Sequence, residues 1–108
     1  MMRSMMFGVV LLASVAGVAS AQDKAKGAQI YVDQKCSVCH SIAGKGNAKG
    51  ALDDIGSKRS TDEIRQWLVD AKGMTVKTKA ARKPEMKAYS LPKDELEPLV
   101  AYLSSLKK

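Results

Sequence analysis

The sequence predicts an all-α domain, and three observations support this. Apolar residues recur at helical spacing in residues 24–34, 60–73 and 92–106. Helix start signals precede the second of these segments. No stretch alternates apolar and polar residues as a half-buried strand would. We therefore expect three helices joined by loops, without internal repeats or a second domain.

The first expected helix covers residues 24–34, where small, charged and apolar residues mix. Gly27 and Tyr31 stand four residues apart and so share one helix face. Four glycines follow within residues 42–58, namely Gly44, Gly46, Gly50 and Gly56. Because glycine marks turns and loops, we expect that stretch to wrap around the domain without forming a regular element.

The second expected helix opens with Ser60 as N-cap and Glu63 three residues later, which is a capping-box pattern. Its apolar residues follow at helical spacing: Ile64, Trp67, Leu68 and Ala71. Gly73 is expected to end this helix. The next residues, 74–83, are polar and strongly basic, so we expect them to form an exposed loop.

The last expected helix covers residues 92–106 and carries an apolar stripe of Leu96, Leu99, Val100, Leu103 and Leu106. Pro98 interrupts the pattern, because its missing N–H leaves the carbonyl of Asp94 without a helical partner. We expect either a kink at this point or a regular helix that begins at Pro98.

Cys36, Cys39 and His40 form the most specific motif of the chain, two thiols three residues apart followed directly by the sole histidine. This is the attachment pattern of a c-type haem. Both sulfurs could reach the vinyl groups of one porphyrin while His40 faces its iron. A structural zinc site would need four ligands, and the chain offers three Cys or His residues at most. A structural disulfide or a thioredoxin-like dithiol could also account for the two cysteines.

The first residues resemble a secretory signal. Arg3 lies in a short basic start, an apolar run covers residues 5–19, and small residues at Ala19, Ser20 and Ala21 fit a cleavage site. We expect residues 1–21 to be a signal peptide and residues 22–108 to be the mature domain in the periplasm, with no stable membrane anchor. An uncleaved anchor is the alternative, but the apolar run is shorter than the ~20 residues that span a bilayer.

The chain carries a formal net charge of +7. Such a balance suits an acidic protein partner, a membrane surface or nucleic acid. No helix-turn-helix, zinc-finger or aromatic RNA-binding motif is present, so nucleic acid is not expected as a partner. A redox protein with an acidic docking surface is the favoured interpretation.

The order of these motifs resembles that of the class I c-type cytochromes over nearly all of residues 22–108. Residues 27–31 look like that family's N-terminal helix, and residues 99–103 look like its C-terminal helix. The resemblance implies that these two helices pack across each other, with a middle helix and loops wrapping one covalently bound haem. It also implies that Cys36 and Cys39 hold the haem and that His40 is the proximal iron ligand.

The segment from Met86 to Leu91 resembles the one that supplies the distal methionine of that family, with Tyr89 as its aromatic residue. Met86 is therefore the expected distal ligand, and Met74 is the other methionine after the signal. Two features depart from the family pattern. Lys87 stands where a proline often follows the methionine, and no proline lies near residues 50–52. The second nitrogen of His40 is expected to bond a backbone carbonyl at Gly50 or Ala51.

A haem ligated on both faces has no open iron position, and His/Met ligation raises its reduction potential. The expected function is single-electron transfer in the periplasm, without enzymatic activity. The alternatives are a haem subunit of a larger redox complex and a peroxidase-like catalyst, for which the chain offers no second histidine. Seven lysines could surround the docking face: Lys35, Lys45, Lys49, Lys77, Lys79, Lys83 and Lys87.

Overall fold

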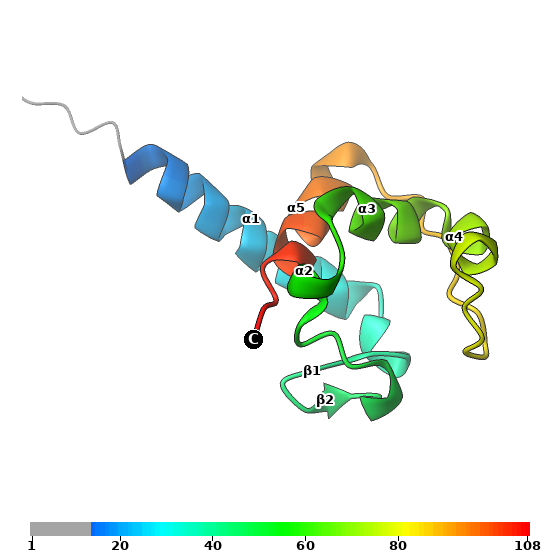
Figure 1. Ribbon diagram of the computed structural model, residues 1–108. Helices are drawn as coiled ribbons and strands as arrows, with labels where there is room; N and C mark the ends of the chain where they lie inside the picture. The colour runs from blue at the N-terminus through cyan, green and yellow to red at the C-terminus, as the bar shows by residue number, and fades with distance from the viewer. Residues whose placement is uncertain (1–13) are drawn as a thin grey trace, which may run out of the picture.

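The computed structural model describes residues 14–108 as a mostly helical molecule with one very small hairpin (Figure 1). The helices and strands in chain order are α1 (Ser14–Asp33), β1 (Ser41–Ile42), β2 (Lys45–Gly46), α2 (Ile55–Lys58), α3 (Thr61–Val69), α4 (Ala71–Thr78) and α5 (Lys93–Ser104). Single turns of 3₁₀ helix occur at residues 36–38 and 48–50. The predicted all-helical domain is confirmed in this mostly helical form.

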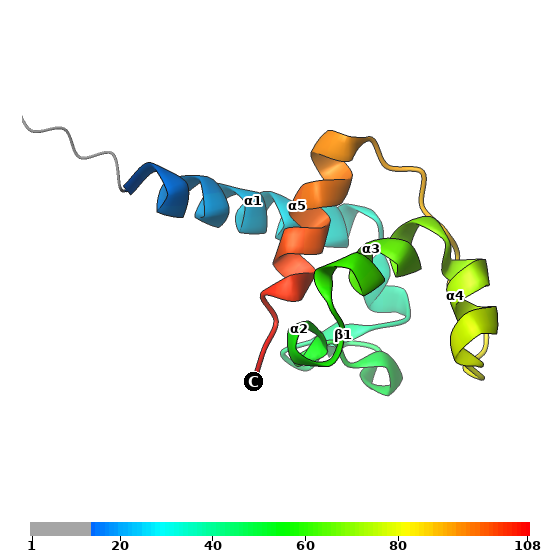
Figure 2. The ribbon, with the colours of Figure 1, turned by 45° about the horizontal axis from the view of Figure 1, so that its top comes forward.

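Helices α1 and α5 pack across each other, as Figures 1 and 2 both show. Gly27 lies at the crossing. A Cβ atom on Gly27 would overlap the carbonyl oxygen of Pro98 and the Cβ atom of Tyr102, so the absence of a side chain permits the close approach. The expected packing of the N- and C-terminal helices is confirmed.

Most of α1 before Gly27 extends beyond the rest of the molecule (Figure 1), and residues 21–26 are exposed. Most of the predicted signal peptide, residues 1–13, lies outside the described residues. Its last residues, 14–21, form the start of α1. Within residues 14–108, none of the helices combines the length and apolar character that crossing a membrane requires.

The core is formed where α1, α3 and α5 meet. It consists of the buried side chains of Ile30, Tyr31, Ile64, Leu68, Leu99, Val100 and Leu103. Leu96 and Leu106, the outer members of the predicted stripe, are partly buried against it. The spacing of the apolar residues in α3 and α5 therefore identified the faces that pack inward.

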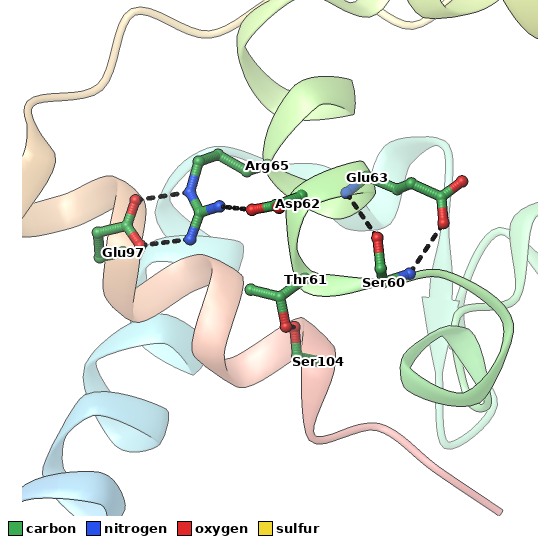
Figure 3. Close-up of polar contacts among 7 residues, drawn as sticks. All are labelled: Ser60, Thr61, Asp62, Glu63, Arg65, Glu97 and Ser104. Atoms are coloured by element: carbon green, nitrogen blue, oxygen red, sulfur yellow. Dashed lines mark hydrogen bonds and ion pairs between the residues drawn. The ribbon is translucent and has the colours of Figure 1, made fainter.

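The capping box at the start of α3 is present (Figure 3). The Ser60 hydroxyl accepts from the N–H of Glu63 at 3.1 Å, and the Glu63 carboxylate accepts from the N–H of Ser60 at 3.0 Å. One turn later, Arg65 donates two hydrogen bonds to Glu97, at 2.9 and 2.8 Å. This bidentate pair connects α3 to α5 and supports their contact through the core.

Helix α3 ends at Val69, so the prediction that it continues to Gly73 was wrong. Asp70 leaves the helical conformation, and its side chain accepts from the N–H of Gly73 at 3.3 Å. That contact caps a new helix, because a carboxylate can bond the free N–H groups of a first turn. Gly73 therefore lies in the first turn of α4 and does not end a helix.

Helix α4 occupies the first half of the segment expected to be an exposed loop, residues 74–78, so the prediction was wrong there. Residues 79–83 are exposed and not helical, as predicted. Ala71, Met74 and Thr75 are buried at helical spacing, and the Thr75 hydroxyl bonds the carbonyl of Ala71 at 2.8 Å. The lysines occupy the exposed face of the same helix. Lys79, with φ of 57°, ends it.

Helix α5 begins at Lys93 and runs without a break through Pro98, so the suggestion that the regular helix starts at Pro98 was wrong. Pro92 is the residue before the first turn, where proline suits the start of a helix. Pro98 lies in the second turn and is buried against α1. The neighbouring hydrogen bonds and this contact maintain the helix.

The glycine-rich segment is largely loop, as predicted, with a few short elements. β1 and β2 pair antiparallel, with Ser41 opposite Gly46 and Ile42 opposite Lys45. Ala43 and Gly44 connect them with φ values of 53° and 80°. Two positive φ values match the two-residue hairpin turn that fits the twist of paired strands. The hairpin follows His40 directly and shapes the loop beside it.

Candidate haem site

Cys36, Cys39 and His40 lie on one tight turn that follows α1. Lys35, with φ of 58°, redirects the chain, and residues 36–38 form a 3₁₀ turn. The carbonyl oxygen of Cys36 accepts from the N–H of Cys39 at 3.1 Å and from the N–H of His40 at 2.9 Å. The three side chains that the motif singled out are thus positioned by one hydrogen-bonded turn.

Both cysteines are free, partly buried thiols and are not joined in a disulfide. Burial raises the pKa of Cys36, so this thiol is protonated at neutral pH. Across the described residues, no three His, Cys, Asp or Glu side chains lie close enough together to hold a metal ion. The turn thus presents two thiols and one imidazole, without a set of ligands for a bare metal.

His40 donates its Nδ1–H to the carbonyl oxygen of Gly50, with an N···O distance of 2.9 Å. This confirms the expected backbone partner and selects Gly50 over Ala51. The bond fixes the imidazole orientation and leaves Nε2 with its lone pair free to bind a metal. Burial lowers the pKa of His40, and the nearby charge of Arg82 acts in the same direction. Both favour the neutral form that metals bind.

Gly50 is held in place by its surroundings. Gly50 is the last residue of the 3₁₀ turn at residues 48–50, which is capped by Asn47, whose side chain accepts from the N–H of Lys49. After Gly50, the N–H of Leu52 bonds the carbonyl of Ser41 at 2.8 Å. A Cβ atom at Gly50 would overlap the carbonyl of Cys39 and the guanidinium of Arg82. Glycine is therefore required where the backbone approaches His40.

The two candidate distal ligands occupy different environments. Met86 is partly buried and packs against the core, as do Tyr89 and Leu91. The N–H of Tyr89 bonds the carbonyl of Leu68 at 2.8 Å, which fixes this segment to α3. Met74, by contrast, is 4% exposed and faces inward from α4. Its side chain fills a buried position of the fold.

Partly buried hydrophobic side chains pack against the core, and several of them come from the Cys36–His40 turn, the loop after it and the Met86 segment. The group includes Cys36, Ile42, Leu52, Ile55, Met86, Tyr89 and Leu91. These side chains would become buried against a large apolar ring, and two thiols, one imidazole and one thioether lie among or beside them. The residues present therefore fit a covalently bound haem. Trp67, partly exposed on α3, lies outside this core cluster within residues 14–108.

A basic cavity of about 530 Å³ adjoins Cys39. Its lining brings together Lys49 and Lys83 from the predicted docking face, and it adds Arg82. Sequence reasoning missed Arg82, because its contact with Gly50 joins segments far apart in the chain. Lys87 lies 5.4 Å from the centre of the Tyr89 ring. Positive charge thus gathers close to the Cys36–His40 turn.

Two crossed terminal helices with a Cys-x-x-Cys-His turn between them define a small protein of the c-type haem class. A comparison with protein-family models matches residues 24–107 to the family described as Cytochrome c. The chain therefore belongs to the cytochrome c family. Searches of curated proteins and of solved structures found no match.

Membership of this family establishes the cofactor and the general activity. The family binds haem c covalently, and Cys36 and Cys39 fit its attachment motif. Its members transfer electrons through the haem, exchange them with redox protein partners, and are typically carriers rather than enzymes.

Proposed function

We propose that this chain is a single-haem electron carrier of the periplasm. Cys36 and Cys39 hold the haem through thioether bonds, His40 is the proximal iron ligand, and Met86 is the distal ligand. The observation that carries this proposal is the hydrogen bond from His40 to Gly50, because it fixes a metal-binding imidazole one residue after the two thiols.

The bound haem would supply reversible one-electron chemistry at its iron. The chain's part is to fix the ligands and exclude water. His40 is held by the Gly50 carbonyl, which increases the basicity of its Nε2. The partly buried apolar side chains around the turn keep the site at low polarity. Iron ligation by the thioether of Met86 and the imidazole of His40 would favour a relatively high reduction potential.

Met86 is favoured over Met74 because of where the two side chains lie. Met86 belongs to the same partly exposed apolar group as Cys36. Met74 would have to leave its buried position in α4 to reach an iron. Since His40 is the only histidine, a site ligated by His40 and Met86 has neither an open iron position nor a distal acid–base residue. We infer a carrier and not an enzyme.

The docking face is the basic surface beside Cys39, formed by Lys49, Arg82 and Lys83. Charges of one sign near the point of electron exchange steer an oppositely charged partner and raise its association rate at low salt. Lys83 also pairs with Glu85 at 3.0 Å, but its side chain remains 72% exposed. The favoured partner is therefore a redox protein with an acidic surface.

Residues 1–21 are proposed to direct export and to be removed, which leaves residues 22–108 as the mature domain. The basic start, apolar run and small-residue site support this. Covalent haem attachment outside the cytoplasm agrees with this location. Mass spectrometry of the exported protein tests the cleavage site, because an N-terminus other than Gln22 would contradict it.

Absorption spectra test the cofactor and its ligands together. The protein should be purified from a host with a working cytochrome maturation system and measured oxidised, reduced and as the pyridine haemochrome. We expect a low-spin c-type spectrum, a weak thioether-to-iron band in the oxidised protein, and a mass increased by one haem. A colourless product of unaltered polypeptide mass would contradict the proposed function.

A further inference from the structure

The guanidinium of Arg82 lies beside the hydrogen bond between His40 and Gly50. A Cβ atom at Gly50 would overlap Nη1 of Arg82 and the carbonyl oxygen of Cys39. The same atom would lie 2.9 Å from Nδ1 of His40. One atom-sized position thus adjoins the guanidinium, the imidazole and the backbone of the turn that carries the thiols. Because Gly50 has no side chain, the charged group of Arg82 can approach the imidazole closely.

No carboxylate within the described part of the chain neutralises the charge of Arg82. Arg59 and Arg65 each form ion pairs with acidic side chains there, whereas Arg82 takes part in none. Lys49 lines the same basic cavity as Arg82 and carries charge of the same sign. Arg82 therefore presents an unpaired positive charge to His40.

The guanidinium adjoins the nitrogen of His40 that does not bind the metal. Nδ1 donates to the Gly50 carbonyl oxygen, so Nε2 is the nitrogen left for iron. Burial lowers the pKa of His40, the Gly50 carbonyl raises it, and the charge of Arg82 lowers it. Arg82 thus opposes any gain of positive charge at Nε2. Oxidation of an iron bound there is such a gain.

We propose that Arg82 raises the reduction potential of the haem iron through its positive charge beside His40. The inference rests on the proposed function, in which His40 is the proximal ligand. Oxidation passes one electron from the site to the redox partner, so the oxidised site carries one more positive charge than the reduced site. A cation fixed beside the proximal ligand disfavours the oxidised site and therefore favours the reduced one.

Solvent limits the size of this effect. Arg82 is exposed, and water and salt weaken the field of an exposed charge. In the holoprotein, we expect Arg82→Gln to lower the equilibrium constant for reduction about threefold, the order of magnitude for one partly screened charge close to the site. At 59 mV per tenfold change for one electron, the potential falls by about 30 mV. Redox titration followed by absorption spectroscopy measures this fall.

Two further variants separate the charge of Arg82 from other roles of its side chain. Arg82→Lys keeps the charge and loses the planar guanidinium, so it should lower the potential by less than about half as much. Lys49→Gln removes a cation from the same cavity. It should change the potential less than Arg82→Gln does, because Arg82 is the charged side chain that acts on His40. Equal falls in Arg82→Lys and Arg82→Gln, or in Lys49→Gln and Arg82→Gln, would overturn the proposal.

The thioether-to-iron band shows whether the ligands stay in place. Arg82→Gln should keep this band in the oxidised protein. Its loss would sink the proposal, because the potential would then change through a ligand and not through a charge.

The pH dependence shows on which group the charge acts. A fixed charge beside His40 should produce the same difference in potential between wild type and Arg82→Gln from pH ~5 to pH ~8. If Arg82 instead paired with a carboxylate of the porphyrin, its removal would raise the pKa of that carboxylate toward this range. A difference in potential that varied with pH would therefore refute an action through His40.

Failure of this inference is distinguishable from failure of the proposed function. If the wild-type protein carries no covalent haem, the proposed function fails. If the wild-type protein is a low-spin c-type haem protein but Arg82→Gln has the same reduction potential, only the role of Arg82 fails.

Discussion

Substituting Gly27 with alanine should destabilise the protein, although alanine is the better helix former. In an isolated helix the change would gain about 1 kcal/mol. Here the new Cβ atom would lie 2.6 Å from the Cβ atom of Tyr102 and 2.8 Å from the carbonyl carbon of Pro98. It would also overlap the Pro98 oxygen. Because two of these atoms belong to the backbone of α5, the helices must separate.

The magnitude follows from these opposing effects. Overpacking of a tight contact costs roughly 1–3 kcal/mol, and the upper end applies where backbone atoms must move. After the gain in helix propensity, a net loss of about 2 kcal/mol remains. For a domain of this size, that loss lowers the melting temperature by roughly 8–16 °C. Thermal unfolding of the holoprotein, followed by circular dichroism, measures it.

The inverse substitution at a nearby exposed position provides the control. Ala25 lies in α1 and is exposed, so Ala25→Gly should lose only helix propensity, about 1 kcal/mol. If propensity alone decided both cases, Gly27→Ala would raise the melting temperature by as much as Ala25→Gly lowers it. That result would refute the reasoning from close helix packing.

Three further predictions concern the ligands, the docking face and pH. Met86→Ala should abolish the thioether-to-iron absorption band of the oxidised protein. Met74→Ala should keep this band but lose about 2–5 kcal/mol of stability, because the Met74 side chain is only 4% exposed. Loss of the band in Met74→Ala alone would show that Met74 and not Met86 is the ligand. Reversing the charges of Lys49 and Lys83 should slow electron transfer to an acidic partner roughly tenfold at low salt and weaken the salt dependence of the rate. The control Lys24→Glu, far along α1, should change neither. If stopped-flow measurements showed the same loss of rate in the control, they would contradict the docking face. The pKa of His40 is lowered in the folded state, so the unfolded chain binds a proton more readily. The free energy of unfolding should therefore fall as the pH drops below the ordinary histidine pKa of 6.5. A urea midpoint that stays unchanged between neutral pH and pH ~5.5 would contradict this expectation.

Local patterns in the sequence were sufficient wherever a short segment determines its own structure. Ser60 and Glu63 form the capping box because the two partners are three residues apart. The leucine stripe identified the buried face of α5 for the same reason, since one helix period sets both spacing and burial. The Cys36–His40 turn is likewise held by bonds within five residues.

Predictions failed where composition concealed a periodic pattern. Basic residues are frequent in residues 74–83, which include the second half of α4, and they suggested a loop. The spacing of Ala71, Met74 and Thr75 was already helical, but the charged and small residues between Ala71 and Met74 lower the mean apolar character of the segment. Asp70 could have been identified as a second N-cap ahead of Gly73. The helix is stabilised by the burial of Met74 against the rest of the fold. The sequence alone does not reveal which residues cover Met74.

Contacts between distant segments could not be derived from local patterns. The packing of Arg82 against Gly50 depends on how the segment before Met86 lies relative to the loop after His40. Similarly, the crossing of α1 and α5 was expected from the family resemblance and not from the spacing of Gly27 and Tyr31. The hairpin turn at Ala43 was missed because alanine rarely adopts a positive φ.

The contact of Gly27 with Pro98 and Tyr102 has a consequence for the order of folding. It joins the beginning of the domain to its end and so closes one long chain loop that contains Cys36, His40 and Met86. The entropy lost in that closure is large compared with that of any local turn. The helix pair can therefore form only after the final residues of the domain have been synthesised, and until then the turn that carries both thiols belongs to a chain whose two ends are not yet joined.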